Sequence, residues 1–124
     1  MTKILIVEDN EMNMRLFSDL LQSKSYTVFE CMDGAKALSI AKKVKPDLVL
    51  MDIQMPGMDG LTITKKIRKT PDISKTPVIA VTAFAMEGDA ERILASGVNA
   101  YISKPIAVPA FFRTIEDTLK THAR

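Results

Sequence analysis

The sequence has almost nothing that would mark a disulfide-stabilised or membrane-spanning protein. Among its 124 residues there is one cysteine, Cys31, which excludes an intrachain disulfide and fits a reducing cytoplasm. No apolar run approaches the ~20 residues that cross a bilayer, and the N-terminal MTKILIVED turns acidic where a secretory signal would stay apolar. We therefore expect a cytoplasmic chain without membrane insertion, in which Cys31 is a small packing residue.

A strong charge of one sign is lacking as well. The chain carries 17 basic and 15 acidic side chains for a net charge of +2, which is too small a bias to indicate a nucleic-acid partner. Two basic clusters stand out, at Lys42, Lys43 and Lys45 and at Lys65, Lys66, Arg68 and Lys69. At helical positions such clusters are typical of a solvated face, so no nucleic-acid partner is expected.

What is present is the composition of one ordinary folded domain. Hydrophobic residues make up 47% and charged residues 26%, which is typical of a globular protein with one core. No linker, low-complexity tract or change of composition interrupts the chain. Residues 1–124 are therefore expected to form a single domain.

Short apolar runs alternate with stretches of helical period along the whole chain. Strands are predicted at Ile4–Val7, Thr27–Phe29, Asp47–Met51, Val78–Val81 and Ala100–Ser103. Helices are predicted after N-caps at Asn10, Asp33 and Asp59, and over about 89–96, with Gly97 as a left-handed stop, and about 108–120. The first, third and fourth strands are nearly continuous Ile, Leu and Val, as in parallel strands covered on both sides. This alternation predicts a doubly wound α/β domain.

Chemically active side chains stand at the ends of the predicted strands. Glu8 and Asp9 follow the first strand, Asp52 the third, Thr82 the fourth and Lys104 the fifth. In a doubly wound sheet the carboxyl ends of the parallel strands meet at one edge, where ligands bind. Because an ionised carboxylate is costly inside a core, we expect Asp52 to emerge at an exposed rim of that edge.

Three carboxylates at one edge repel each other unless a cation joins them. A hard divalent ion held by carboxylates, a carbonyl and waters solves this, and Mg²⁺ suits such a site, with Mn²⁺ as a substitute. Nucleotide binding is disfavoured, because VEDNEMN after the first strand holds acids and no G-x-G-x-x-G or G-x-x-x-x-G-K-[ST] occurs. Glu8 and Asp9 are therefore predicted to hold a metal ion.

A carboxylate beside Mg²⁺ can attack a phosphoryl group and become an acyl phosphate. This predicts Asp52 as the nucleophile, with Lys104 and the Thr82 hydroxyl binding oxygens of the transferred group. The haloacid-dehalogenase-type phosphatases, which also form an aspartyl phosphate, need a second acid two residues later, where this chain has Gln54. Turnover of small phosphoesters is not expected. His122, the only histidine, lies in a tail expected to be frayed, so the phosphoryl donor is another protein.

The motifs IVEDN, LVLMDIQMPGMDG, PVIAVTAFA and YISKP resemble, in order and spacing, the receiver domain of two-component response regulators. The resemblance spans essentially the whole chain. It implies a flavodoxin/CheY-like (βα)5 fold with a five-stranded parallel sheet in the order 2-1-3-4-5. It also implies that Asp52 accepts the phosphoryl group. The groups implied to surround Mg²⁺ are Glu8, Asp9, Asp52 and the backbone carbonyl of Gln54.

The same resemblance gives roles to residues at the remaining strand ends. Thr82 and Lys104 are implied to contact the phosphate, and the Lys104–Pro105 peptide bond is implied to be cis. Phosphorylation is implied to draw Thr82 inward, so that Tyr101 turns from exposed to buried. The surface of the fourth helix, fifth strand and fifth helix is thereby altered for a partner. An ordinary strand role for Tyr101 stays open.

More narrowly, NEMNMRLFSDLL, ALSIAKKVKPDLVLMDIQMP, VTAFAMEGDAERI and AYISKPI are similar to the single-domain cell-cycle regulators of this family. This likeness implies no output domain, and as partners sensor histidine kinases of cell division or a histidine phosphotransfer protein. We expect a monomer before phosphorylation, and no turnover enzyme, since the protein catalyses only its own phosphorylation and dephosphorylation. Two alternatives stay open. One is a phosphate-independent adaptor, and the other is a receiver module cut from a hybrid kinase, which Met1 and the compact ending disfavour.

Overall fold

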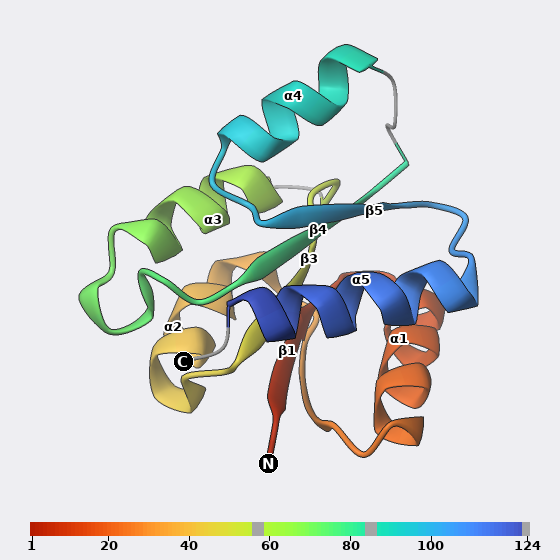
Figure 1. Cartoon of the computed structure of the whole chain (residues 1–124). Coiled ribbons are helices and arrows are strands. Elements are labelled where there is room, and N and C mark those ends of the chain that lie inside the picture. Colours follow the sequence, from red (N-terminus) through yellow and green to blue (C-terminus); the bar gives the residue numbers. More distant parts are fainter. Residues whose placement is uncertain (56–58, 84–86, 123–124) are drawn as a thin grey trace.

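Strands and helices alternate along the chain (Figure 1), and the computed structural model describes residues 1–55, 59–83 and 87–122, with the backbone alone for 87–90. The strands are β1 (Lys3–Val7), β2 (Thr27–Cys31), β3 (Leu48–Asp52), β4 (Val78–Thr82) and β5 (Ala100–Ser103). The helices are α1 (Glu11–Ser23), α2 (Gly34–Val44), α3 (Gly60–Arg68), α4 (Glu87–Ala95) and α5 (Val108–Thr121), with one 3-10 turn, η1 (Pro71–Ile73). No helix in these described ranges is long and apolar enough to cross a membrane.

The strands form one parallel sheet in the order β2-β1-β3-β4-β5, which confirms the predicted fold class and strand order. β3 lies at the centre and pairs with β1 on one side and with β4 on the other. Because all five strands run in the same direction, their C-terminal residues lie along one edge of the sheet. This edge, which carries the last residues of β1, β3, β4 and β5, is called the C-terminal edge below.

Successive residues of the central strands point to opposite faces of the sheet and enter two separate cores. Leu5, Val7, Val49, Met51, Val78 and Ala80 pack with residues of α2, α3 and α4, whereas Ile4, Ile6, Leu48, Leu50, Ile79 and Val81 pack with residues of α1 and α5. Figure 1 shows α1 and α5 together on one side of the sheet, and α2 and α3 on the other. Covering on both faces explains why these strands are apolar throughout.

Three helices begin next to the C-terminal edge, each behind an N-cap that the sequence predicts. The side-chain oxygens of Asn10, Asp33 and Asp59 accept hydrogen bonds from the N–H groups of Asn13, Ala35 and Leu61 at 2.9, 3.0 and 2.9 Å. These contacts satisfy amide groups that a helix start would otherwise leave unpaired. The positive ends of α1 and α3 therefore follow β1 and β3, the strands whose ends carry Glu8, Asp9 and Asp52.

Several boundaries differ from the prediction by one or two residues. β2 continues to Cys31, and β3 starts at Leu48, one residue after Asp47, whose Oδ2 accepts a hydrogen bond from the Lys3 N–H at 2.7 Å. α4 starts at Glu87 instead of Asp89, and η1 was not predicted because one turn is too short to show a helical period. Gly97 does have the positive φ expected of a helix stop, at 108°.

Candidate functional site

Two buried carboxylates lie at the C-terminal edge of the sheet. Glu8 follows β1 and is 0% exposed, and Asp52 is the last residue of β3 and is 3% exposed. The prediction that Asp52 emerges at an exposed rim is therefore wrong. The pairing of β3 with β4 continues past Asp52, since the Ile53 N–H donates to the Val81 carbonyl at 3.2 Å. The Asp52 carboxylate is stabilised by neighbouring protein groups instead of bulk water.

Asp52 is held by one backbone amide and faces one ammonium group. The Gln54 N–H donates to Asp52 Oδ1 at 2.9 Å, and Lys104 Nζ lies 3.5 Å from Asp52 Oδ2. The same Nζ lies 3.6 Å from Glu8 Oε1, so one cation is shared by two carboxylates. Lys104 follows β5, and its N–H donates to the Thr82 carbonyl at 2.8 Å. The Lys104–Pro105 peptide bond is cis, as the resemblance implies.

Among the described residues, the C-terminal edge holds more negative charge than Lys104 balances. Glu8, Asp9 and Asp52 each offer an oxygen, and these oxygens lie within 4.8 Å of one another. Glu8 Oε1 is buried without a hydrogen-bond partner in the described part of the chain. Burial, and after it the adjacent Asp52 carboxylate, raises the pKa of Glu8 from 4.5 to about 7. A buried carboxylate oxygen that lacks a hydrogen bond and lies among three carboxylates fits a hard divalent cation such as Mg²⁺.

The two residues assigned to a conformational switch lie on neighbouring strands. Thr82 ends β4, is fully buried, and stands in register with Ser103 of β5. Tyr101 stands in register with Ala80 and packs against the core that contains α2 and α3. Tyr101 is half-buried. It therefore lies between the exposed and buried positions that the resemblance assigns to the two states.

One contact at the site was missed by the sequence analysis. The Gln54 side chain accepts a hydrogen bond from the Ala83 N–H through Oε1 at 2.8 Å. This bond joins the segment after β3 to the segment after β4, next to Asp52 and Thr82. No sequence pattern signals it, because it depends on a side-chain rotamer and on how two loops meet.

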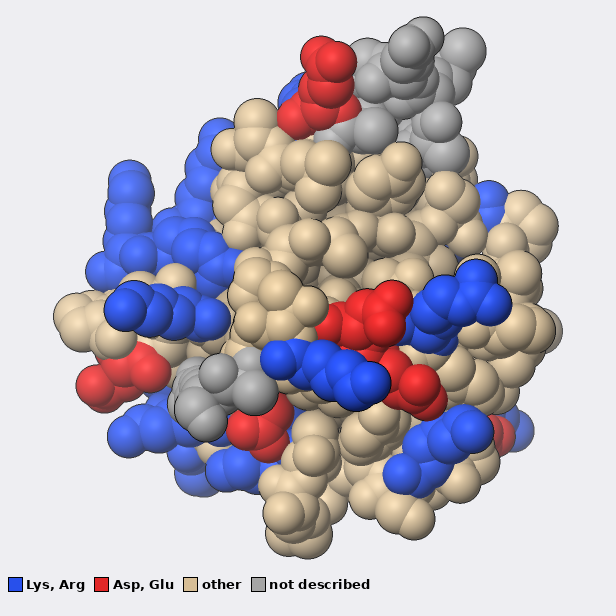
Figure 2. Space-filling model, in the orientation of Figure 1, with Lys and Arg blue, Asp and Glu red and all other residues tan. Residues whose placement is uncertain are grey.

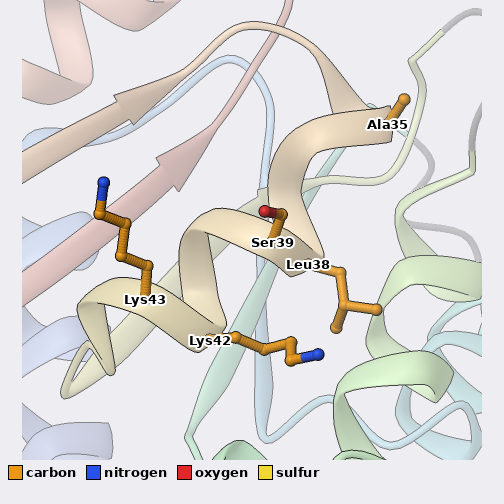
Figure 3. A pocket seen from close by; sticks show the side chains of 5 residues that line it. All are labelled: Ala35, Leu38, Ser39, Lys42 and Lys43. Atoms are coloured by element: carbon orange, nitrogen blue, oxygen red, sulfur yellow. The ribbon is translucent and has the colours of Figure 1, made fainter.

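A hollow of about 500 Å³ lies elsewhere, on α2. It is lined by Ala35, Leu38, Ser39, Lys42 and Lys43 (Figure 3). Lys and Arg side chains gather on this side of the molecule (Figure 2), and the lysines of α2 and α3 are exposed, as expected of a solvated face. The lining holds no carboxylate and no acid–base pair. The candidate site therefore remains the carboxylate cluster at the C-terminal edge.

Comparison with known proteins identifies the class of protein that this fold and site define. The response regulator receiver domain family matches residues 4–116, and the chain belongs to this family. Among its relatives, the polar-differentiation response regulator DivK of Brucella anthropi is 51% identical over 116 residues, covering 94% of each chain. DivK of Brucella ovis is 52% identical over 120 residues, covering 96% of this chain and 98% of the relative. The chain is thus closely related to DivK proteins.

Solved structures of similar fold agree with this assignment. The Vibrio cholerae chemotaxis protein CheY4 aligns with a TM-score of 0.89 at 27% identity, covering 95% of this chain and 98% of that one. The receiver domain of sensor histidine kinase PA1611 from Pseudomonas aeruginosa aligns with a TM-score of 0.88 at 34% identity, covering 96% and 98%. That structure has a magnesium ion coordinated in its active site cleft. Receiver domains interact with histidine kinases and in general are not turnover enzymes.

Proposed function

We propose that this protein is a signalling switch that receives a phosphoryl group on Asp52 from a sensor histidine kinase or a histidine phosphotransfer protein. The observation that carries the proposal is the buried Asp52 carboxylate, which shares a single ammonium group with Glu8 and has Asp9 beside it. A carboxylate with a purely structural role is expected to have a full set of partners. This cluster has a deficit of positive charge, which suits a reaction that brings a cation and a phosphoryl group to it.

In the proposed reaction Asp52 is the nucleophile. One of its carboxylate oxygens forms a bond to phosphorus while the P–N bond to the donor's histidine breaks, and the electron pair of that bond returns to the imidazole ring. The Gln54 N–H orients the carboxylate by binding Oδ1. Lys104, which is 3.5 Å from Oδ2, binds an oxygen of the transferred group, and the Thr82 hydroxyl binds another.

Glu8, Asp9, Asp52 and the backbone carbonyl of Gln54 are the groups proposed to hold Mg²⁺, with Mn²⁺ as a substitute. The bound ion supplies positive charge that neutralises the transferring group. Glu8 must be ionised to act as a ligand, and its pKa is raised to about 7. Binding of the cation near neutral pH therefore releases a proton, which gives an independent measure of occupancy.

The proposed response runs from β4 to β5. Phosphorylation adds roughly −1.5 to −2 charge units and three acceptor oxygens at Asp52. Thr82 moves toward these oxygens, and Tyr101 fills the space that Thr82 leaves, which changes the surface formed by α4, β5 and α5. The half-buried position of Tyr101 supports this, because completing its burial needs only a local movement.

The relation to DivK supports a role in the cell cycle. We propose that the partners are sensor histidine kinases that control cell division and that the protein acts in the cytoplasm as a monomer before phosphorylation. A DivK relative is covered over 98% of its length, which supports a receiver domain over residues 1–124. Such a protein acts by binding other proteins instead of DNA.

Incubation with a small acyl-phosphate donor and Mg²⁺, followed by mass spectrometry, tests the proposal. We expect one phosphoryl addition on Asp52 that is stable in acid and labile in base, and no addition for Asp52→Asn or without a divalent metal. Asp33→Asn is the matched control, because Asp33 is a carboxylate near the same edge that only caps α2. Absence of any addition in the wild type with either metal would overturn the proposal and leave the phosphate-independent adaptor.

A further inference from the structure

Gly60, the first residue of α3, lies directly against the backbone of β3 at the proposed phosphorylation site. A Cβ atom at position 60 would lie 2.5 Å from the Asp52 carbonyl oxygen, 2.8 Å from Ile53 Cα and 2.9 Å from Met51 Cγ. All three distances are too short for a real side chain. Two of the three atoms belong to the backbone and cannot rotate away as the end of a side chain can. Any side chain at position 60 must therefore displace α3 or the end of β3.

The close approach, and not the backbone conformation, is what requires glycine here. Gly60 is not among the residues with positive φ in the described chain, which are Ser25, Lys45 and Gly97. In the first turn of a helix alanine costs less conformational entropy than glycine. Alanine would therefore be the more favourable residue at position 60 if the backbone of Asp52 and Ile53 did not lie so close.

Both elements that meet at Gly60 are held firmly on their other sides. In α3, the Asp59 side chain caps the Leu61 N–H at 2.9 Å, and the hydroxyl of the fully buried Thr64 donates to the Gly60 carbonyl at 2.8 Å. In β3, Ile53 is tied to β4 by its 3.2 Å hydrogen bond to Val81. The first turn of α3 is thus a fixed support for the backbone that carries Asp52.

We propose that Gly60 is a positioning residue that sets the distance of the Asp52 carboxylate from Glu8 and Asp9. The inference rests on the proposed function and identifies what fixes the geometry of its site. Glu8 is also held by a strand that does not touch Gly60, because its N–H donates to the Cys31 carbonyl of β2 at 3.0 Å. A side chain at position 60 would therefore move Asp52 relative to Glu8 instead of shifting the cluster as a unit. Metal ligands tolerate displacements of only ~0.2 Å, and a displacement of ~1 Å costs a reaction about 100-fold.

The test compares Gly60→Ala with Gly97→Ala. Gly97 has a φ of 108° and lies against the Arg68 side chain, so its substitution strains the fold without touching the carboxylates. Mg²⁺ affinity is measured by calorimetry, and the amide resonances of Asp52 and Ile53 are recorded by NMR in metal-free protein. We expect Gly60→Ala to shift these resonances, to weaken Mg²⁺ binding about 10-fold or more, and to slow phosphorylation at saturating Mg²⁺ about 100-fold. Gly97→Ala should leave the resonances of Asp52 and Ile53 unchanged. Its Mg²⁺ affinity and its phosphorylation rate should stay within about twofold of the wild type.

Two further variants complete the test. One separates crowding by the backbone from crowding by the Met51 side chain, and the other is used if Gly60→Ala does not fold. Met51→Ala added to Gly60→Ala removes only the contact with Met51 Cγ, so no recovery of Mg²⁺ affinity is expected, and full recovery would overturn the inference. If Gly60→Ala does not fold, Thr64→Val decides, because it loosens the same turn by removing the hydrogen bond to Gly60. Weaker Mg²⁺ binding by about threefold or more supports the inference, and unchanged binding contradicts it.

These measurements can contradict the positioning role of Gly60 and the proposed phosphotransfer separately. A wild type that binds Mg²⁺ without being phosphorylated contradicts phosphotransfer, and Gly60 is then judged on Mg²⁺ affinity and the amide resonances alone. A folded Gly60→Ala with wild-type affinity and wild-type resonances overturns the positioning role, even where the wild type is phosphorylated as proposed.

Discussion

Charged side chains are buried at both edges of the sheet, but they have many hydrogen-bond partners at one edge and few at the other. At the opposite edge, where β4 and β5 begin, the guanidinium of the half-buried Arg68 donates four hydrogen bonds. The acceptors are the carbonyls of Gly97, Ser74 and Thr76 and Asn99 Oδ1, at 3.0, 3.2, 2.7 and 2.9 Å. At the C-terminal edge, Glu8 Oε1 has no hydrogen-bond partner in the described chain and shares one lysine with Asp52. Burial lowers the pKa of Arg68 and raises that of Glu8, so both charges are disfavoured by desolvation.

The difference lies in the partners that surround each charge. Arg68 is surrounded by neutral oxygen atoms that accept hydrogen bonds from four of its five N–H groups, so the guanidinium links α3 to the segment before β4 and to the segment before β5. The carboxylate cluster has too few donors, so it gains stability when a cation or a phosphoryl group with its own counter-ions arrives. A nearly complete set of partners thus accompanies the structural charge of Arg68, and an incomplete set accompanies the proposed phosphorylation site.

The largest effect that separates the two edges is expected for Lys104→Met. Loss of the Lys104 ammonium group should slow phosphorylation of Asp52 by a small acyl-phosphate donor about 10²–10³-fold, because the transferred oxygens lose their cation. Lys42→Met, a change at an exposed lysine of α2, should leave the rate unchanged. The rate is followed by mass spectrometry, and equal rates for the two variants would refute the role of Lys104.

Arg68→Met should lower the stability of the protein without changing its phosphorylation rate. It removes the four hydrogen bonds that Arg68 donates to Gly97, Ser74, Thr76 and Asn99, so the free energy of unfolding should fall by about 3 kcal/mol. The phosphorylation rate of the folded protein should stay within about twofold of the wild type. Urea unfolding gives the first quantity. A large loss of rate without loss of stability would show that the two edges are not independent.

The pKa of Glu8 predicts a pH dependence of stability in metal-free protein. Between pH 4.5 and about 7 the folded state keeps a proton on Glu8 that the unfolded state has lost, so stability falls as the pH rises through this window and levels off above it. The difference between pH 5 and pH 7.5 should be on the order of 2 kcal/mol for Glu8. Unfolding in EDTA at both pH values measures it.

Two controls isolate this contribution from other titrating groups. Glu8→Gln cannot titrate, so its change in stability between pH 5 and pH 7.5 should be smaller than that of the wild type by the stated amount. Excess Mg²⁺ should cancel the fall in the wild type, because the ion binds the ionised form. An identical pH dependence in wild type and Glu8→Gln would show that Glu8 is ionised throughout this range.

The smallest effect is expected for Asp33→Ala. Asp33 begins α2 near the C-terminal edge and accepts the Ala35 N–H at 3.0 Å. Its loss should lower the free energy of unfolding by about 1 kcal/mol and leave the phosphorylation rate unchanged. Thermal unfolding and the mass assay together measure both. A loss of rate would mean that Asp33 belongs to the reactive cluster.

The sequence predicted the fold and the grouping of site residues well, because both follow from topology. The apolar runs of the central strands require two covered faces, and parallel strands bring their ends to one edge. Glu8, Asp9, Asp52 and Lys104 could therefore be grouped before their distances were known. N-caps at Asn10, Asp33 and Asp59 were equally accessible, because capping depends on local sequence.

Features that depend on distant atoms were not predictable. The burial of Asp52 was missed because it depends on Lys104 and on the continued pairing of Ile53 with β4, which no local pattern shows. The bond from Ala83 to the Gln54 side chain depends on a rotamer. The crowding at Gly60 is invisible for a similar reason, since a glycine at a helix start gives no sign of which backbone lies against it.

The order in which the site residues occur along the chain has a consequence for biosynthesis. Glu8 and Asp9 emerge first from the ribosome, and Lys104, which follows the last strand, emerges last. A nascent chain, or a fragment that ends before β5, contains Asp52 but not Lys104. Under the proposed mechanism, a kinase that meets such a chain finds a poor acceptor. The signal is then delivered only to molecules whose synthesis and folding have passed the final strand.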